Sequence, residues 1–332
     1  MGVARPAVPM APAVLAIDAG NSKTDAALVA ADGTVLGTGR AGGFQPPLTG
    51  VEAAVDVLAE AVAKAAAAAG LPGVPRAARV SACLANADLP VEERRLADAV
   101  AARGWGAATE VRNDTFAILR AGVDRPRGVA VVCGAGINCV GMLPDGRTAR
   151  FPALGQISGD WGGGSGLAQE ALWWAARAED GRGGPTALAA ALPAHFGLAS
   201  MAALIEALHL GGLDRGRLHE LVPVLFAVAA AGDAVASAVV ERQAGEVVAL
   251  ASVALDRLGL LGQEVPVLLG GGVLAARHPQ LNGRIEELLS HRAPRARVSV
   301  VTAAPVLGAA LLGLDALHAP PAALTRLRAH FE

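Results

Sequence analysis

The sequence predicts an α/β protein of two duplicated domains, each built on a mostly parallel sheet that begins with a β-hairpin. Three observations lead to this prediction. Apolar runs of strand length alternate with single helical segments, the pattern of a largely parallel sheet packed on both faces. A strand, a glycine turn, a second strand and an Asp-Gly turn occur near the N-terminus, and the same order returns from Val129. The chain has 332 residues, enough for two domains of ordinary size.

The first half of the chain carries the first copy of this repeat. Its hairpin turn is Asp32–Gly33, a residue pair that favours a tight turn between antiparallel strands. The long helix after the third strand should end at Gly70, since glycine is the usual residue just past a helix. The elements expected in this half are strands at 13–18, 26–31, 34–39, 78–85 and 108–114, and helices at 51–69, 91–104 and 115–122.

The second copy runs from Val129 to Phe151, with a glycine turn at Gly134–Gly136 and a hairpin turn at Asp145–Gly146. Four features in the same order indicate an internal duplication. The chain after this copy is richer in helix, and no low-complexity linker separates the halves. The elements expected there are helices near 166–178, 186–195, 200–209, 217–230, 233–258, 281–290 and 305–317, and strands at 264–269 and 297–301.

Composition excludes several classes of function. A net charge of −2 and a pI near 6.4 give no basic surface for nucleic acid or for an anionic membrane. Tyrosine is absent and aromatic residues make up 3%, which disfavours base-stacking platforms. The three cysteines form no CxxC pair, which disfavours zinc sites and disulfides and favours a cytoplasmic location. Residues 1–12 are expected to form a disordered tail, and neither a signal peptide nor a membrane span is predicted.

The stretch DAGNSKTD, Asp18–Asp25, is the first candidate phosphate site. A glycine turn leaves backbone N–H groups free to face an anion, and the neighbouring hydroxyls and lysine add donors. Asp18 ends an apolar strand, where a carboxylate is costly unless it meets a cation such as the Mg²⁺ that accompanies a nucleotide. The alternative is an ordinary hairpin with polar residues. The candidate nucleotide-binding residues of this turn are Gly20, Asn21, Ser22, Lys23 and Thr24.

Two further stretches follow strands. CGAGIN, with Gly134, Ala135 and Gly136, is a second candidate anion site or a tight hairpin turn. It is not a dinucleotide fingerprint, because a strand follows where that fold needs a helix. In RNDTFAIL, Asp114 lies at the carboxyl end of a parallel strand, where the sites of α/β proteins lie, although it could simply cap the next helix.

Two glycine-rich loops complete the set. In GQISGDWGGGSG, Asp160 could accept hydrogen bonds from sugar hydroxyls and Trp161 could cover an apolar ring face, unless the segment is only a flexible loop. In VPVLLGGGVL, the residues Gly270, Gly271 and Gly272 would let a flat group lie against the backbone. Close packing of a helix on a strand explains the same glycines equally well.

Taken in order, these stretches resemble those of the acetate and sugar kinase/Hsp70/actin superfamily, and within it the BadF/BadG/BcrA/BcrD-type ATPases, specifically the N-acetylglucosamine kinases. The resemblance spans about Leu15 to Leu314. It implies two duplicated actin-like (ribonuclease H-like) domains around an ATP cleft, one of residues 13–126 plus 305–332 and one of 127–304 with helical additions. DAGNSKTD then corresponds to the first phosphate motif, CGAGIN to the second, and Gly270–Val273 to the adenosine motif.

The resemblance also implies roles for single residues. Asp114 takes the place of the catalytic aspartate. The sugar-binding positions fall on Asn138, Asp160 and Gln45, and Gly155 is what remains of a Gly-Trp-Gly segment before the loop. The chain departs from the pattern at Ala135, where the second phosphate motif has threonine, and at Trp161, which replaces a glutamate. The phosphate motifs are therefore retained while the sugar pocket is altered.

The implied reaction is phosphoryl transfer from ATP, with Mg²⁺, to the 6-hydroxyl of N-acetylglucosamine, by a cytoplasmic protein that could form a homodimer. Three alternatives stay open. The acceptor could be glucosamine or another sugar. The protein could be an ATPase that activates a 2-hydroxyacyl-CoA dehydratase-type enzyme and holds an iron–sulfur cluster through cysteines such as Cys133 and Cys139. It could also be a sugar-sensing regulator, although neither end offers a DNA-binding segment.

Overall fold

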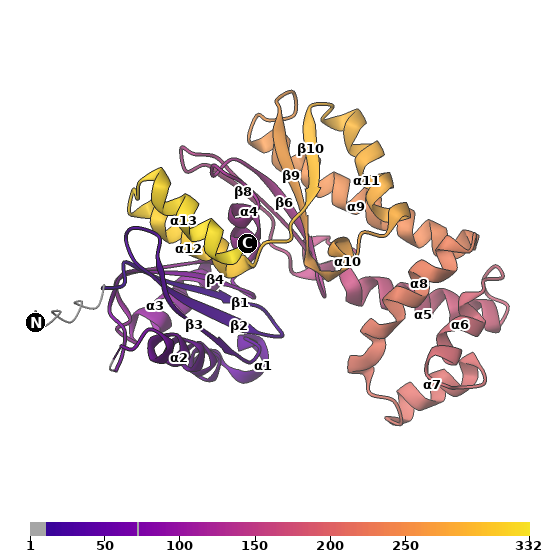
Figure 1. Ribbon diagram of the computed structural model, residues 1–332. Helices are drawn as coiled ribbons and strands as arrows, with labels where there is room; N and C mark the ends of the chain where they lie inside the picture. Colours follow the sequence, from indigo (N-terminus) through magenta and orange to yellow (C-terminus); the bar gives the residue numbers. More distant parts are fainter. Residues whose placement is uncertain (1–10, 72) are drawn as a thin grey trace, which may run out of the picture. The chain divides into compact units, whose positions relative to one another are not determined.

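A computed structural model describes residues 11–71 and 73–332 (Figure 1). The chain divides into two compact units. The first unit comprises the described residues up to Pro126 together with Thr302–Glu332, and the second comprises Arg127–Val301. Each unit contains one five-stranded sheet. Most of the tail expected to be disordered, residues 1–10, lies outside the described residues.

The sheet of the first unit has the strand order β3-β2-β1-β4-β5. Its central strand β1 (Val14–Ala19) pairs antiparallel with β2 (Thr24–Val29) and parallel with β4 (Ala77–Leu84). The edges are β3 (Val35–Ala41), antiparallel to β2, and β5 (Gly106–Asn113), parallel to β4. The strands β1, β4 and β5 run in the same direction, so their carboxyl ends lie side by side, next to the β1–β2 turn.

Helices cover both faces of this sheet (Figure 1). Leu15 and Ile17 face the core formed with α2 and α3, whereas Val14 and Ala16 face α12, because successive side chains of a strand point to opposite faces. The helices of the first unit are α1 (Pro46–Thr49), α2 (Val51–Ala68), α3 (Pro90–Ala101), α4 (Thr115–Ala121), α12 (Pro305–Ala316) and α13 (Pro321–Phe331).

A buried ion pair fastens the last helices to α4. The Arg120 guanidinium, 1% exposed, makes two hydrogen bonds to the Asp315 carboxylate of α12, at 2.6 and 3.1 Å. From α13, Arg328 donates to the carbonyl oxygen of Ala121 at 2.8 Å and to that of Val123. Together these contacts close the C-terminal end of α4 with charge-assisted hydrogen bonds.

The second unit repeats the topology of the first. Its strand order is β10-β9-β6-β7-β8, and the three strands β6, β7 and β8 are antiparallel while β6, β9 and β10 are parallel. The predicted duplication is therefore confirmed. The prediction of mostly parallel sheets is wrong, because the third strand of each copy extends the hairpin and makes half of the pairings antiparallel. The strands are β6 (Gly128–Cys133), β7 (Ile137–Met142), β8 (Thr148–Arg150), β9 (Val265–Gly270) and β10 (Ala296–Val300).

The long helix α9 packs against β6 and β7, and the helical additions gather around α5 and α8. The five-residue helix α10 directly follows β9, and neither it nor α13 of the first unit was expected from the sequence. The helical segments of the second unit are η1 (Gly155–Ser158), α5 (Gly163–Glu179), α6 (Leu188–His195), α7 (Met201–Leu210), η2 (Arg215–Glu220), α8 (Leu221–Ala230), α9 (Ala234–Arg257), α10 (Gly271–Ala275) and α11 (Pro279–Arg292).

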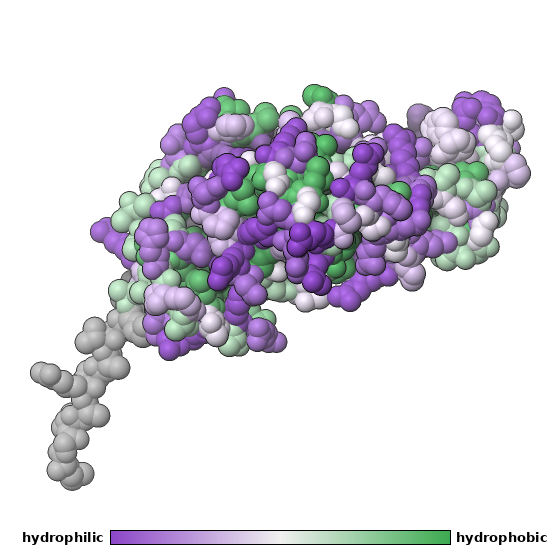
Figure 2. Space-filling model, turned by 90° about the horizontal axis from the view of Figure 1, so that it is seen from above, coloured by the Kyte–Doolittle hydropathy of each residue, from purple (hydrophilic) through white to green (hydrophobic). Residues whose placement is uncertain are grey.

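Within the described ranges, no single helix is long and apolar enough to cross a membrane. One pair, Arg215–Ala230 with Ala234–Arg257, meets the criteria of length and apolarity together but is bent by 113°. The apolar residues of this pair, such as Leu225 and Val247, belong to the core of the second unit. Hydrophilic residues cover much of the face shown in Figure 2, with smaller hydrophobic areas between them.

Candidate active site

The turn between β1 and β2 is held in place by a neighbouring segment. The Gly20 N–H donates to the Lys23 carbonyl at 2.9 Å, which closes the turn and leaves the side chains at its tip exposed. The Gln45 side chain donates to the Asn21 carbonyl at 2.8 Å. Gly43 lies so close that a Cβ there would be 2.1 Å from the same carbonyl oxygen. Gln45, predicted as a sugar contact, thus supports the predicted phosphate turn through its amide nitrogen.

Asn86 is a second support of this turn, and sequence reasoning missed it. Its side-chain nitrogen donates to the Asn21 side-chain oxygen at 3.1 Å and to the Phe44 carbonyl at 3.4 Å. Its φ of 61° is in the left-handed region, which asparagine tolerates better than most residues. The sequence signal available was an asparagine two residues past a buried strand.

Asp18 and Asp25 occupy paired positions on β1 and β2 but have different environments. Asp25 forms ion pairs with Arg40 at 2.5 Å and with Lys23 at 3.4 Å. Asp18 is 7% exposed, and no side chain among the described residues hydrogen-bonds its carboxylate. Burial raises the pKa of Asp18 well above its ordinary value; the nearby charges of Asp114 and Asp25 add to this effect, and Lys23 opposes it.

Thr24, the last candidate of the turn, differs from its neighbours. Its side chain is completely buried, and its hydroxyl has no hydrogen-bond partner. Because it precedes Asp25 in the strand, its side chain points to the opposite face of the sheet from the paired carboxylates. Thr24 therefore presents only backbone groups at the surface of the turn.

Asp114 directly follows β5 and precedes α4. Its backbone is helical (φ −60°, ψ −25°), and its side chain makes no capping hydrogen bond. Asn113 acts in its place, because its side-chain oxygen accepts from the Thr115 N–H at 3.0 Å while its nitrogen donates to Asp88 at 2.8 Å. Burial raises the pKa of Asp114 to about 6, against the opposing effect of the Thr115 donors. Asn113 thus supplies the side-chain cap of α4, and the Asp114 carboxylate lies at the carboxyl end of a parallel strand with a raised pKa.

The described residues contain no group of three or more His, Cys, Asp or Glu side chains placed to hold a metal ion by themselves. Mg²⁺ in nucleotide sites needs only one or two carboxylates, since water and phosphate oxygens supply its other ligands. Asp18 is a buried carboxylate without a hydrogen-bond donor, in the field of two further carboxylates, so it fits such an ion.

Three glycine-rich stretches of the second unit converge on the β6–β7 turn. The Gly134 and Ala135 carbonyls accept hydrogen bonds from the first N–H groups of α5, those of Gly164 at 2.8 Å and Ser165 at 2.9 Å. A Cβ at Gly163 would lie 2.4 Å from the Gly136 backbone. The sequence predicted each stretch as a candidate site, and the structure brings them together.

The third stretch, Gly270–Gly272, reaches the same turn from β9. A Cβ at Gly271 would lie 2.4 Å from the backbone carbon of Cys133, and the φ of Gly271 is 79°. Only glycine fits both the contact and the conformation. The β6–β7 turn is thus contacted by a backbone segment without side chains, formed by Gly270, Gly271 and Gly272.

Gln243 on α9 supports the segments that meet at the β6–β7 turn, and it was not identified from the sequence. Its side chain is fully buried, its oxygen accepts from the Gly163 N–H at 3.0 Å, and its nitrogen lies 3.6 Å from the Cys133 sulfur. Gly162 lies against the same amide, because a Cβ there would be 2.3 Å from the Gln243 oxygen. The signal for it was a polar residue at a position of the apolar stripe of α9, between Val240 and Val247.

The sugar-binding candidates of the second unit each bond within their own segment. The Asn138 side-chain oxygen accepts from the Cys139 N–H at 2.7 Å. Asp160 accepts from the Ser158 hydroxyl, and its own N–H donates to the Gly155 carbonyl at 3.0 Å. Gly155 therefore shapes the loop that carries Asp160. Next to it, the Arg242 guanidinium lies 4.0 Å from the centre of the Trp161 ring.

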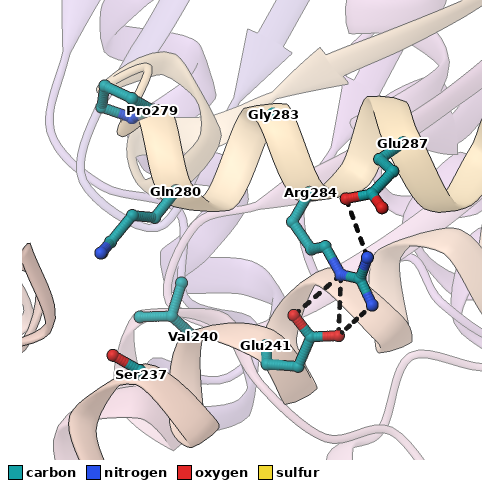
Figure 3. Close-up of a pocket in the computed structure, with 8 residues that line it drawn as sticks. All are labelled: Ser237, Val240, Glu241, Pro279, Gln280, Gly283, Arg284 and Glu287. Carbon is teal, nitrogen blue, oxygen red and sulfur yellow. Dashed lines mark hydrogen bonds and ion pairs between the residues drawn. The ribbon is translucent and has the colours of Figure 1, made fainter. Parts of the chain in front are cut away.

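A separate cavity of about 360 Å³ lies between α9 and α11 (Figure 3). Arg284 extends along it and forms ion pairs with Glu241 at 2.7 Å and Glu287 at 2.8 Å. The two carboxylates therefore more than neutralise the charge of the guanidinium. The cavity contains none of the residues predicted as sites, so it is not the candidate active site.

Comparison with solved structures shows the fold class. A candidate N-acetylglucosamine kinase from Chromobacterium violaceum matches with a TM-score of 0.69 over 92% of this chain and 99% of its own, at 24% identity. A glucokinase of the ROK family from Streptomyces griseus, solved with glucose and AMPPNP, matches with a TM-score of 0.57 over 92% and 99%, at 18% identity. The predicted α/β fold of two duplicated actin-like domains is confirmed.

The chain belongs to the BadF/BadG/BcrA/BcrD ATPase family, whose model matches residues 15–313. An N-acetylmuramic acid/N-acetylglucosamine kinase from Clostridium acetobutylicum is 26% identical over 190 residues, 57% of this chain and 62% of the relative. An N-acetyl-D-glucosamine kinase from Dictyostelium discoideum is 27% identical over 212 residues, 62% of this chain and 65% of the relative. The chain thus spans somewhat less than two thirds of these curated relatives.

Proposed function

We propose that this protein is an ATP-dependent kinase of an amino sugar, with N-acetylglucosamine as acceptor and its 6-hydroxyl as the nucleophile. The observation that carries the proposal is the state of Asp114. Its carboxylate is at the carboxyl end of a parallel strand, is not used as a helix cap, and has a pKa of about 6. Membership of an ATPase family and likeness to two curated amino-sugar kinases support it.

The first unit supplies the groups for proton transfer and for charge. Asp114 accepts the proton of the sugar hydroxyl, whose oxygen then attacks the γ-phosphorus of ATP while the bond to ADP breaks. The turn from Gly20 to Thr24 holds phosphate through backbone N–H groups, together with the Ser22 hydroxyl and the exposed Lys23 ammonium. Asp18 would hold Mg²⁺, which would supply neutralising charge to the phosphates.

The second unit supplies backbone to the nucleotide and side chains to the sugar. Gly134, Ala135 and Gly136 form the second phosphate site, and the glycines of Gly270–Gly272 lie against the adenosine. Their convergence on one turn supports this assignment. Asn138, Asp160 and Gly155 contact the sugar. An Asn138→Ala variant should lose preference for the acetylated amino group.

The alternative role as an activator that holds an iron–sulfur cluster receives no support from the thiols. Cys133 and Cys139 are completely buried within β6 and β7, and burial raises the pKa of both. Cluster ligands shared between subunits need exposed thiolates. A brown chromophore in anaerobically purified protein would nevertheless overturn the kinase proposal.

An ADP-release screen over glucose, glucosamine, N-acetylglucosamine and other sugars tests the function. We expect N-acetylglucosamine to give the highest kcat/KM and the product to carry phosphate on the 6-oxygen, as read by ³¹P–¹H correlation. Glucosamine in first place would replace the acceptor, and ADP release without any acceptor dependence would remove the kinase assignment. The proposal includes a homodimer, which size-exclusion chromatography with light scattering tests, and a cytoplasmic location, which cell fractionation tests.

A further inference from the structure

Three backbone carbonyls of the β1–β2 turn are engaged by the first unit itself. The Gly20 carbonyl accepts from the Phe44 N–H at 2.9 Å, and the Lys23 carbonyl accepts from the Gly20 N–H at 2.9 Å. The Asn21 carbonyl accepts from the Gln45 side chain at 2.8 Å. Because an oxygen lone pair that faces a phosphate repels it, a turn whose oxygens are already bonded is better suited to an anion.

The orientation of the Asn21 side chain follows from its contact with Asn86. The Phe44 carbonyl can only accept, so the Asn86 atom that lies 3.4 Å from it is the amide nitrogen. The same nitrogen lies 3.1 Å from the Asn21 side chain, where the oxygen is therefore the atom that accepts. The amide nitrogen of Asn21 is left without a partner among the residues that the structure describes, and the side chain is exposed.

Asn86 connects the turn to the segment behind it through one amide group. Its φ of 61°, two residues past β4, lets its nitrogen reach both Asn21 and Phe44. Glycine at this position would keep the backbone conformation and lose only the amide. The Asn21 donor is thus oriented before a ligand binds, which lowers the entropy cost of binding.

We infer that the amide nitrogen of Asn21 donates directly to a phosphate oxygen of the bound nucleotide, and that Asn86 is a positioning residue that orients this donor. The inference rests on the proposed function and adds a side-chain donor to Ser22 and Lys23, which are exposed at the same tip. Lys23 also lies 3.4 Å from the Asp25 carboxylate, so part of its charge is already compensated. No carboxylate in the described ranges competes for the Asn21 amide.

Titration calorimetry of ATP with Mg²⁺ tests this in the wild type, Asn21→Ala, Asn86→Gly and the double variant. We expect Asn21→Ala to raise the Kd about tenfold, the size of one lost hydrogen bond to a charged group. Asn86→Gly should raise it about threefold, because an unrestrained amide adopts the binding orientation only part of the time. The double variant should bind like Asn21→Ala alone, since Asn86 then has no amide to orient.

Two further variants control for charge and for backbone conformation. Asn21→Asp should bind ATP more weakly than Asn21→Ala, because a carboxylate repels phosphate. His318→Gly is the matched control for Asn86→Gly, since His318 is exposed, has a φ of 53° and lies two residues past α12, outside the predicted site. It should leave the Kd unchanged. Thermal unfolding of each variant measures stability separately.

The outcomes separate this inference from the proposed function. An unchanged Kd in Asn21→Ala would remove the donor, and additive effects of the two substitutions would show that Asn86 does not act through Asn21. Either result would overturn the inference and leave the kinase in place. If the wild type binds no ATP, the proposed function is wrong, and inorganic tripolyphosphate then tests the turn by itself. No binding of tripolyphosphate, or equal binding by wild type and Asn21→Ala, would overturn the inference in that case.

Discussion

The side-chain oxygen of Asn113 accepts the backbone N–H of Thr115 at 3.0 Å, at the first turn of α4. This bond satisfies one of the N–H groups that a helix leaves unpaired at its start. Asp114, which lies between the two residues, makes no capping hydrogen bond of its own. The sequence admitted two roles for Asp114, and the capping bond is made by Asn113 instead.

Replacement of Asp114 should separate activity from stability. We expect Asp114→Asn to lower kcat by about 10²-fold or more, the usual contribution of a general base. The folded pKa of about 6 lies above the ordinary 3.8, so this carboxyl makes folding less favourable as the pH rises between those values. The variant should therefore be more stable at pH 7, by about 1–2 kcal/mol after allowance for partial exposure. Steady-state kinetics and thermal unfolding measure both effects.

Asp124→Asn is the matched control, since Asp124 is an exposed carboxylate ten positions further on. It should change neither quantity appreciably. A folded Asp114→Asn protein with normal turnover would show that Asp114 has no part in the chemistry.

The pH dependence of kcat/KM should show an acidic limb near pH 6. Below that pH Asp114 is protonated and cannot accept the proton of the hydroxyl, so the rate should fall by about tenfold for each further pH unit. Rates measured from pH 5 to pH 8.5 at saturating Mg²⁺ check this. A limb that disappears in Asp18→Asn but persists in Asp114→Asn would assign the titration to Asp18 instead.

The paired carboxylates of β1 and β2 should respond differently to neutralisation. Asp18→Asn should raise the Mg²⁺ concentration for half-maximal activity by about tenfold or more, the order of effect seen when metal-site groups are lost. Asp25→Asn should have the smaller effect on Mg²⁺, because Arg40 and Lys23 already neutralise Asp25. The measurement is a Mg²⁺ titration of activity at fixed ATP. An equal response of the two variants would remove Asp18 from the metal site.

Two glycines of α5 provide a paired test of the contact between the start of this helix and the β6–β7 turn. Gly163→Ala places a Cβ 2.4 Å from the Gly136 backbone at a φ of 69°, so it should destabilise the protein by about 1–3 kcal/mol and raise the KM for ATP. Gly166→Ala has open space around its Cβ and should be close to wild type. Thermal unfolding and ATP titrations distinguish the two. Equal stability and equal KM for ATP in the two variants would mean that the backbone around Gly163 and Gly136 accommodates the added Cβ without an effect on nucleotide binding.

Strongly periodic segments were predicted closely from the sequence. The helix expected at 51–69 is α2, Val51–Ala68, and the strand expected at 264–269 is β9, Val265–Gly270. The helix α13 was missed because Ala323 and Leu327 are the only residues of this helix that are buried, too few to produce a clear apolar stripe. Residue propensity and apolar periodicity were therefore enough to predict these elements, but not a helix that buries only two residues.

The candidate site was only partly predictable, because its supports depend on distant backbone. Motif spacing indicated the turn at Gly134–Gly136 and the segment Gly270–Gly272, but their contact exists only after β6 and β9 pair. Gln243 follows two charged residues in the sequence, so it looked like a solvated position. Gln45 was expected to face a ligand, and its bond to Asn21 depends on the path of the chain between β3 and α1.

The first unit obtains its last helices only after residues 305–331 have left the ribosome. Until then the face of β1 that carries Val14 and Ala16 has no α12 to cover it, and Arg120 has no Asp315 to pair with. The residues of the second unit are contiguous, from Arg127 to Val301, so it can complete its fold during translation. Synthesis of this chain therefore reverses the usual order, in which the N-terminal part finishes first. A released chain that ends at Val301 should be cleaved by protease in its first unit and protected in its second.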